Sequence, residues 1–248
     1  MHAGIEAHMI RLILTALFLF WFLILFCPVH IVLWIMGKID KDLMSRVSLR
    51  LVQWVLRVVF WLSGSKLTVT GRENIPDDQP VLYVGNHRSY FDIVVMYPNI
   101  KGQMGFIAKK EIGMVFPLIP WMNNIHCLFL DRSDLKKGFQ TILDGTELIK
   151  SGISICIYPE GHRNKGTGLL EFHNGSLKIA EKAKCPIIPV AITGTAEIYE
   201  KHRPFIRKSN VTLQFGEPIY TDSLDRESKK HLSETVQKAI LDMLPEGY

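Results

Sequence analysis

The 248-residue sequence has few cysteines and none of the spacings that build zinc sites or small disulfide frameworks. No two cysteines form a Cys-x-x-Cys pair, and all of them stand among apolar neighbours; they are Cys27, Cys127, Cys156 and Cys185. This pattern predicts buried free thiols in a reducing compartment. His-x-x-x-His and His-Glu-x-x-His pairs are also missing, which disfavours a metallohydrolase.

Charged residues are missing from residues 12–36, which read LILTALFLFWFLILFCPVHIVLWIM. A helix rises about 1.5 Å per residue, so this run is long enough to cross a hydrocarbon core of about 30 Å. A cleaved signal peptide fits poorly, because the run is too long and lacks a small-x-small cleavage site. Pro28 and His30 interrupt the run, so two possibilities stay open: it spans the bilayer, or it bends and enters one leaflet.

Residues 42–62 have a different, amphipathic pattern. A polar stripe recurs at helical spacing along them, formed by Arg46, Arg50, Gln53 and Arg57. The other faces are apolar and carry tryptophan, which favours a helix at the membrane interface over the alternative of a helix packed in the core. Basic residues are more frequent after the first apolar run than before it, which predicts that the body of the protein lies on the cytoplasmic side.

Residues 64–248 alternate between strand and helix patterns. We expect strands at 67–71, 80–85, 105–110, 125–132, 153–161, 187–194 and 211–219, and helices at 91–97, 134–151, 170–184 and 229–244. This order predicts an α/β fold with a mostly parallel central sheet flanked by helices. Residues 1–63 would add a hydrophobic and amphipathic two-helix membrane motif. In such folds the catalytic groups lie on loops at the carboxyl ends of the strands.

A cluster of polar residues follows the strand expected at 80–85; its members are Asn86, His87, Ser89 and Asp92. If His87 lies in the turn after the strand and Asp92 in the first turn of the next helix, the carboxylate can accept a hydrogen bond from one ring nitrogen. The other nitrogen is then a general base that can activate a hydroxyl of the substrate. Alternatively, Ser89 and Asp92 form a capping box that satisfies backbone N–H groups, and the two roles are compatible.

A second polar cluster follows the strand expected at 153–161. The glycine-rich stretch at 157–168 contains Glu160, Gly161, His162 and Arg163. A turn of this kind can bind phosphate or carboxylate, although an ordinary polar loop would look similar. The net charge of +5 is consistent with an anionic partner, and the chain has no recognised nucleic-acid-binding motif.

The order of these blocks resembles the 1-acylglycerol-3-phosphate acyltransferase family. The matching blocks are N-H-x-S-x-x-D at 86–92, K-K-E at 109–111, F-L-D-R at 129–132, E-G-H-R at 160–163 and I-I-P-V at 187–190. The resemblance covers residues 67–193. It implies that an acyl group is transferred to the sn-2 hydroxyl of lysophosphatidic acid, giving phosphatidic acid in phospholipid biosynthesis.

The resemblance also implies roles for individual residues. His87 is the general base and Asp92 orients it. Arg132 and Arg163, joined by Lys109, hold the glycerol phosphate. Glu160 and Gly161 shape the acceptor site; the supporting residues are Asn86, Ser89 and His162.

The implied acyl donor is acyl-CoA or acyl carrier protein, with no metal and no bound cofactor. The other implied partners are lysophosphatidic acid and a bilayer with anionic headgroups.

The sequence departs from the family pattern in two blocks. The third block usually reads E-G-T-R-S, whereas His162 and Asn164 stand here, and a Pro-x-x-Gly pattern is altered at Pro117 to Pro120. These departures put the shape of the acceptor pocket in question.

Three alternatives stay open. One is an acyltransferase for glycerol-3-phosphate or another lysolipid. The second is a metallohydrolase with His87, Asp92, Glu160 and His162 as ligands, and the third is a non-catalytic binder of anionic lipids.

Overall fold

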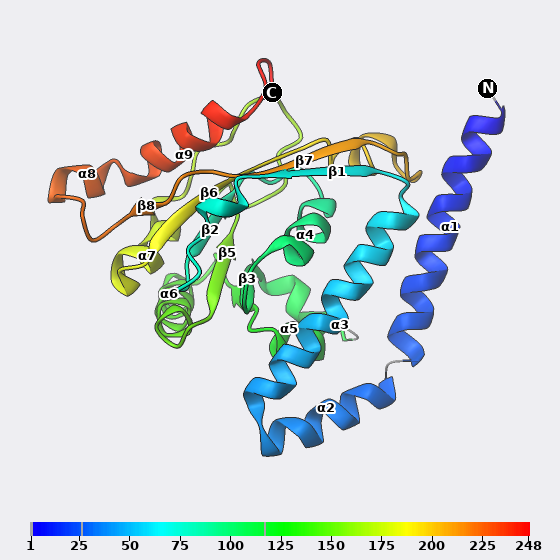
Figure 1. Cartoon of the computed structure of the whole chain (residues 1–248), viewed down its shortest axis with the longest axis horizontal. Coiled ribbons are helices and arrows are strands. Elements are labelled where there is room, and N and C mark those ends of the chain that lie inside the picture. Colours follow the sequence, from blue (N-terminus) through cyan, green and yellow to red (C-terminus); the bar gives the residue numbers. More distant parts are fainter. Residues whose placement is uncertain (1, 26, 117) are drawn as a thin grey trace. The chain divides into compact units, whose positions relative to one another are not determined.

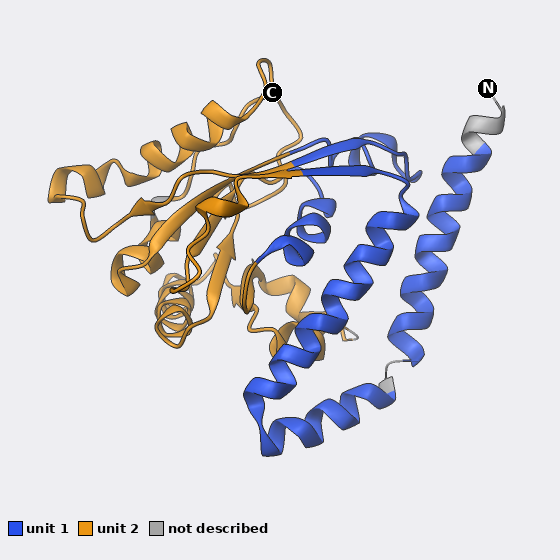
Figure 2. Cartoon of the chain, in the orientation of Figure 1, with its two compact units in different colours: residues 1–68, 88–100, 193–212 blue, residues 69–87, 101–192, 213–248 orange. Residues whose placement is uncertain are grey.

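The computed structural model describes residues 2–25, 27–116 and 118–248, which group into two compact units (Figure 2). Unit 1 comprises Met1–Thr68, Arg88–Ile100 and Thr193–Thr212. Unit 2 comprises Val69–His87, Lys101–Ile192 and Leu213–Tyr248. The chain therefore passes repeatedly between the units, and the expected domain boundary after residue 63 stays a prediction.

Unit 1 begins with three helices (Figure 1): α1 (His2–Leu25), α2 (Cys27–Ile39) and α3 (Lys41–Leu62). The charge-free run at 12–36 is divided between α1 and α2, and residue 26 lies outside the described residues. The N-terminal region thus contains three helices where two were predicted. By length and composition, the Glu6–Leu25 part of α1 can cross a membrane.

Helix α3 has the predicted extent, and the side chain of Asp40 caps its first turn by accepting from the Leu43 N–H at 2.9 Å. It packs against α1, α2, α4 (Phe91–Met96) and the 3₁₀ turn η2 (Tyr97–Asn99). Gln53 donates to the carbonyl oxygen of Tyr97 at 3.0 Å, and Arg57 to that of Pro98 at 3.5 Å. Gln53 and Arg57 therefore bind backbone groups of unit 1. For this half of the polar stripe, the alternative of a helix packed in the core describes α3 better than a helix at the membrane interface.

The sheet follows the predicted α/β plan. Its strands are β1 (Lys66–Thr70), β2 (Leu82–Gly85), β3 (Met104–Lys109), β4 (Leu128–Leu130), β5 (Ser154–Ile157), β6 (Pro186–Thr193), β7 (Asn210–Phe215) and β8 (Ile219–Tyr220). The order is β1-β7-β6-β2-β5-β3-β4, with β8 beside β6. Strand β2 pairs in parallel with β5 and β6, and β3 pairs in parallel with β4 and β5. The predicted mostly parallel sheet is therefore confirmed.

Three helices of unit 2 cover one face of this sheet: α6 (Leu135–Lys150), α7 (Lys178–Ala183) and α9 (Leu232–Met243) (Figure 1). Their apolar side chains form one core with β2, β5 and β6, in which Leu82, Ile155, Ile187 and Val236 are fully buried. Strand β2 is buried on both faces, which explains its unbroken apolar sequence. The other elements are η1 (Arg72–Asn74), η3 (Lys110–Met114), α5 (Ile119–Asn124), η4 (Asn174–Leu177), η5 (Glu200–His202) and α8 (Arg226–Lys230).

The helix predicted at 170–184 is longer than the helix observed there, α7 (Lys178–Ala183). Helix α7 begins only at Lys178, because backbone groups of Leu170 are bound by side chains instead of by a helix. Its N–H donates to Glu160 at 2.9 Å, and its carbonyl oxygen accepts from Gln237 at 3.2 Å. The sequence pattern could not show these long-range bonds.

Three other elements differ in their limits. The strand expected at 125–132 is reduced to β4, because α5 extends to Asn124 and His126 adopts a left-handed φ of 60°. The strand expected at 211–219 is divided into β7 and β8, and between them the Gly216 N–H donates to the Pro189 carbonyl at 2.8 Å. The closing helix is divided into α8 and α9 at His231.

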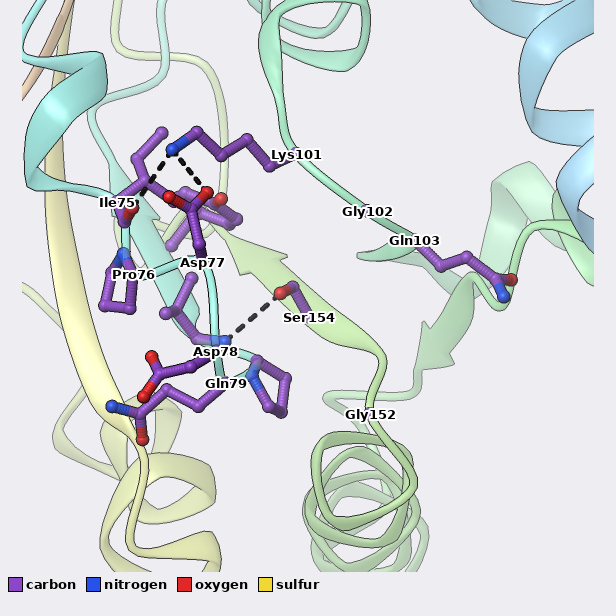
Figure 3. Close-up of a pocket in the computed structure, with 13 residues that line it drawn as sticks. Ile75, Pro76, Asp77, Asp78, Gln79, Lys101, Gly102, Gln103, Gly152 and Ser154 are labelled. Atoms are coloured by element: carbon purple, nitrogen blue, oxygen red, sulfur yellow. Dashed lines mark hydrogen bonds and ion pairs between the residues drawn. The ribbon is translucent and has the colours of Figure 1, made fainter.

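A pocket of about 250 Å³ lies at the amino ends of β2, β3 and β5 (Figure 3). The Lys101 ammonium reaches across it to Asp77 at 2.6 Å and to the Ile75 carbonyl at 3.3 Å. Ser154 accepts from the Val81 N–H at 3.1 Å. This pocket is at the edge of the sheet opposite to His87, so it does not contain the predicted site.

Candidate active site

The predicted histidine lies at the carboxyl edge of the sheet. His87 follows β2, and Glu160 follows β5, the parallel neighbour of β2. Adjacent strand ends bring the two together: the His87 backbone N–H donates to Oε1 of Glu160 at 2.8 Å. The structure thus joins the two polar clusters that the sequence places 73 residues apart.

Asn86 fixes the strand end that carries His87. Its side-chain oxygen accepts from the Ile192 N–H and its amide donates to the Ile192 carbonyl, both at 2.8 Å. The same amide contacts the Tyr248 hydroxyl. Asn86 is 1% exposed, so these bonds satisfy polar groups that have little access to water.

The imidazole ring of His87 stacks on the aromatic ring of Tyr158. The rings of His87 and Tyr158 are stacked with centroids 4.3 Å apart and 7° between their planes. Phe106 stacks on Tyr158 in turn, at 5.7 Å. Tyr158 is buried, and a Cβ on Gly85 would approach its ring to 3.1 Å. Gly85, Tyr158 and His87 therefore pack against one another.

Glu160 is a buried carboxylate that joins two loops. One oxygen accepts from His87 and the other from the Leu170 N–H at 2.9 Å, and the side chain is 2% exposed. Burial raises the pKa of this carboxyl, and the two backbone N–H bonds oppose that rise. Through these two bonds Glu160 ties the His87 backbone to the loop at Leu170, and its part in the acceptor site stays a prediction.

Gly161 gives room to a guanidinium. Its φ is 80°, and a Cβ built there would lie 2.0 Å from Nη1 of Arg132. The structure thus brings together Glu160, Gly161 and Arg132, three of the residues that the resemblance assigns to the acceptor site. Arg132 is exposed by its accessible surface, although local desolvation of the guanidinium lowers its pKa, and it keeps its charge at neutral pH.

The loop that carries Arg132 is held by ion pairs. Asp131 accepts from the Lys110 ammonium at 2.9 Å and from the Ser133 hydroxyl at 2.6 Å, and these bonds lower its pKa to about 2. Lys109, at the end of β3, is exposed and lies 3.9 Å from Glu111. Lys109 is therefore available to solvent beside this loop, and its part in acceptor binding stays a prediction.

Asp92 lies in unit 1, in the first turn of α4. One oxygen accepts from the backbone N–H groups of Arg88 and Ser89, both at 2.8 Å, and the other from the Thr195 hydroxyl at 2.6 Å. Ser89 in return accepts from the Phe91 N–H at 3.0 Å and also contacts Glu200. Ser89 and Asp92 thus satisfy backbone N–H groups before and at the start of α4, although Tyr90 is the N-cap residue and makes no side-chain cap bond. The contact between Asp92 and the His87 ring stays a prediction.

The third block contributes an unexpected contact. Asn164, which replaces the usual serine, donates its backbone N–H to the His87 carbonyl at 2.7 Å. Its side-chain oxygen accepts from the Gly166 N–H and its side-chain amide donates to the Gly168 carbonyl, both at 2.8 Å, so Asn164 bridges the loop that follows it. His162 is exposed and Arg163 is half-buried. The pairing of Arg163 with Arg132 stays a prediction, and Pro117 lies outside the described residues.

Sequence reasoning missed Tyr158, Asn164 and Thr195 as positioning residues. Tyr158 and Asn164 lie within or next to a motif block, and this proximity was the available signal. Thr195 had none, because its bond to Asp92 joins residues 103 apart.

Buried thiols were expected and are found at Cys127, Cys156 and Cys185. Burial raises the pKa of Cys185 to about 12, so this thiol does not ionise at neutral pH. Among residues 2–25, 27–116 and 118–248, no group of three or more His, Cys, Asp or Glu is placed to hold a metal ion. That the reaction needs no metal or cofactor stays a prediction.

Residues 66–193, which include the parallel strands and the loops that carry His87 and Arg132, match the family model described as Acyltransferase. The chain belongs to this family and is an enzyme of the acyltransferase class.

Several named relatives are similar along most of the chain. The 1-acyl-sn-glycerol-3-phosphate acyltransferase of Cocos nucifera is 32% identical over 77% of this chain and 62% of its own length, so the chain spans less than two thirds of it. The enzyme of the same name from Borreliella burgdorferi is 27% identical over 80% of each chain. The crystal structure of the 1-acyl-sn-glycerophosphate (LPA) acyltransferase PlsC from Thermotoga maritima shares the fold, with a TM-score of 0.76, 24% identity and coverage of 95% and 97% of the two chains.

Proposed function

We propose that this protein transfers a fatty acyl group from a thioester to the sn-2 hydroxyl of lysophosphatidic acid, giving phosphatidic acid. The observation that carries the proposal is the chain of contacts in unit 2 that runs from His87 through Glu160 and Gly161 to Arg132. These contacts link the segment that carries His87 to the loop of Gly161 and through it to Arg132, which supports a base and a cation in one site. The printed names of the relatives supply the acceptor.

His87 is the general base. An alcohol is too weak an acid to attack a thioester unaided, so its proton passes to the imidazole as the new C–O bond forms. The C–S bond then breaks, and the thiolate leaves and takes up a proton. General-base catalysis of this kind contributes about 10²–10⁴ in rate. Stacking on Tyr158 supports this role, because it fixes the ring before the acceptor arrives.

Arg132 holds the phosphate of the acceptor, joined by Arg163 and Lys109. A guanidinium can bind two phosphate oxygens at once, which fixes the position of the hydroxyl on the same molecule. Gly161 keeps this guanidinium close to the Glu160 loop and therefore to the His87 backbone. The donor is acyl-CoA or acyl carrier protein, and the reaction uses no metal and no bound cofactor.

The enzyme works at the cytoplasmic face of a membrane with anionic headgroups. Helix α1 supports membrane association because its Glu6–Leu25 part has the length and composition to cross a bilayer. Both the acceptor and the product are lipids, so attachment to the bilayer shortens the search for substrate. Basic residues after α1 support the cytoplasmic side.

The proposal is tested by thiol release from palmitoyl-CoA, with lysophosphatidic acid, glycerol-3-phosphate or no acceptor. Release that requires lysophosphatidic acid is the expected result. Release with glycerol-3-phosphate alone would keep the chemistry and change the acceptor. The absence of release with both palmitoyl-CoA and acyl carrier protein donors would favour the alternative of a non-catalytic lipid-binding protein. A separate metal analysis of the purified protein tests the metallohydrolase alternative, which requires bound metal.

His87→Ala should reduce the rate by about 10²–10⁴ while the circular dichroism spectrum stays unchanged. His231→Ala is the matched control, because this histidine is exposed and pairs only with nearby glutamates in the described structure. The control should keep the normal rate. A His87→Ala variant of near-normal activity would contradict the general-base role.

A further inference from the structure

Unit 2 carries an exposed apolar turn directly after β3. The turn, here called the apolar tip, consists of Met114, Val115 and Phe116, whose exposed fractions are 73%, 43% and 80%. Phe116 is more exposed than any of the large apolar residues on the outer face of α1, which reach at most 63%. Isolated exposed apolar residues are common on proteins, but three adjacent ones mark a surface that contacts a partner or a membrane.

Backbone hydrogen bonds hold the apolar tip. The Val115 N–H donates to the Ile112 carbonyl at 3.1 Å, and the Val115 carbonyl accepts from the Leu118 N–H at 2.9 Å. At its base, a Cβ on Gly113 would lie 3.0 Å from the Phe129 ring, so the turn packs closely on β4. These contacts hold the backbone of residues 112–116 against unit 2 while the side chains of the tip stay exposed.

Several lysines lie in the segments next to the apolar tip, together with Glu111 and Asp131. Lys109 and Lys110 precede the tip, and Lys110 bonds to Asp131 and to the Ser133 hydroxyl at 2.9 and 3.1 Å. These bonds join the segment before the tip to the loop that leads into α6, where Leu135 is 91% exposed and is followed by the exposed Lys136 and Lys137. Apolar side chains at the outside with lysines behind them match the surface of a bilayer, whose anionic headgroups lie above the hydrocarbon.

We propose that the apolar tip of unit 2 inserts into an anionic phospholipid bilayer, as a membrane contact separate from α1. Met114 and Phe116 enter the acyl-chain region while Lys109 and Lys110 bind lipid phosphates. Arg132 follows Asp131, the residue to which Lys110 is bound, so the contact holds Arg132 near the headgroups. If the proposed function is correct, the phosphate of a membrane-bound acceptor reaches Arg132 without leaving the bilayer.

The experiment uses the full chain with one environment-sensitive fluorophore on Phe116→Cys. Cys27 is changed to alanine, and the thiols of Cys127, Cys156 and Cys185 are buried. The protein is added to vesicles of equal parts phosphatidylcholine and phosphatidylglycerol, with or without lipids that carry a quencher on the acyl chain. Leu241→Cys is the matched control, an exposed leucine on α9 in the same unit. Ile13→Cys on α1 reports whether the protein has bound.

The proposal predicts a blue shift and loss of most emission at position 116 on quencher-bearing vesicles, with no change at position 241. Vesicles of phosphatidylcholine alone should reduce the effect. Emission at 116 that stays as in water, while position 13 is quenched, would overturn the proposal. A shift at 116 that depends on protein concentration without lipid would also overturn it, in favour of a second copy. None of these readouts requires turnover, so a failure of the proposed function is detected separately by the thiol assay.

Discussion

At the scale of single residues, Gly161 allows a sharp test of the phosphate site. Alanine at this position would place a Cβ 2.0 Å from Nη1 of Arg132, so the guanidinium must move. Hydrogen bonds to charged groups contribute about 1.5–3 kcal/mol, so we expect Gly161→Ala to raise the acceptor KM by about tenfold or more. Initial rates at varied lysophosphatidic acid measure this directly.

Backbone strain must be separated from the displacement of Arg132. Gly102→Ala is the matched control: its φ is 67° against 80° for Gly161, and a Cβ there meets nothing within 4 Å. Both variants carry a left-handed alanine, at a cost of about 1–2 kcal/mol. Equal changes of acceptor KM in the two would show that strain, and not Arg132, explains the effect.

Thr195 is a positioning residue for Asp92. Its hydroxyl is buried and donates to the carboxylate at 2.6 Å, so Thr195→Val removes the donor and keeps the shape. We expect kcat to fall about tenfold, as for loss of one hydrogen bond to a charged group, with the acceptor KM little changed. Thr195→Ser should restore most of the rate.

Thr221→Val controls for the general cost of removing a buried hydroxyl. Thr221 is 1% exposed, and its hydroxyl donates to the Ala180 and Cys185 carbonyls, both at 3.2 Å. This variant should lose stability in thermal unfolding but keep its kcat. If both valine variants lose kcat to the same extent, Thr195 has only a structural role.

At the scale of elements, Glu160 joins the end of β2 to the loop before α7, and this junction should respond to pH. Burial raises the pKa of Glu160 above its unfolded value, so the folded state binds a proton more tightly than the unfolded chain. The resulting contribution to stability is complete below the unfolded pKa, near 4.5, and is lost as pH rises through the folded pKa.

Glu160→Gln removes this titration and also one of the two acceptors for backbone N–H groups. We expect the variant to be less stable by about 1–3 kcal/mol, the cost of an unsatisfied buried donor. The advantage of the native protein over the variant should shrink as pH rises from 4.5, which urea unfolding in detergent at several pH values measures. An advantage that grows with pH would show that the N–H bonds outweigh burial.

Helices and strands could be predicted from the sequence where the local sequence pattern and the tertiary packing favour the same conformation. The strands β2 and β5 are short apolar runs, and helix α6 has an Asp134 cap and an amphipathic pattern, so local sequence and packing favour the same conformations despite Gly138 and Gly145. Residues 170–177 carry a helical pattern, but α7 begins only after the 3₁₀ turn η4, and the Leu170 N–H is bound by Glu160, a residue that the local pattern does not include. The same limit applies at the site: His87, Arg132 and Glu160 lie in recognisable blocks, whereas Thr195 acts through a contact formed only on folding.

At the scale of the whole molecule, the chain combines an apolar N-terminal helix with a basic body. Deleting residues 1–63 would be a poor test of membrane attachment, because α3 packs on α4 inside unit 1 and its removal would expose that face. Substitutions on the outer face of α1 leave α3 in place, and they therefore isolate the contribution of the bilayer.

Leu17 and Trp21, one helical turn apart, are 48% and 52% exposed, and Leu17→Lys with Trp21→Lys charges this face. A lysine at the centre of a spanning helix costs about 2.5–3.5 kcal/mol, so the double variant should move from the pellet to the supernatant after alkaline washing of membranes. Leu241→Lys on α9 is the control and should stay in the pellet. If the double variant also stays there, this face of α1 is not what attaches the protein, and the apolar tip or other surfaces hold the enzyme at the membrane.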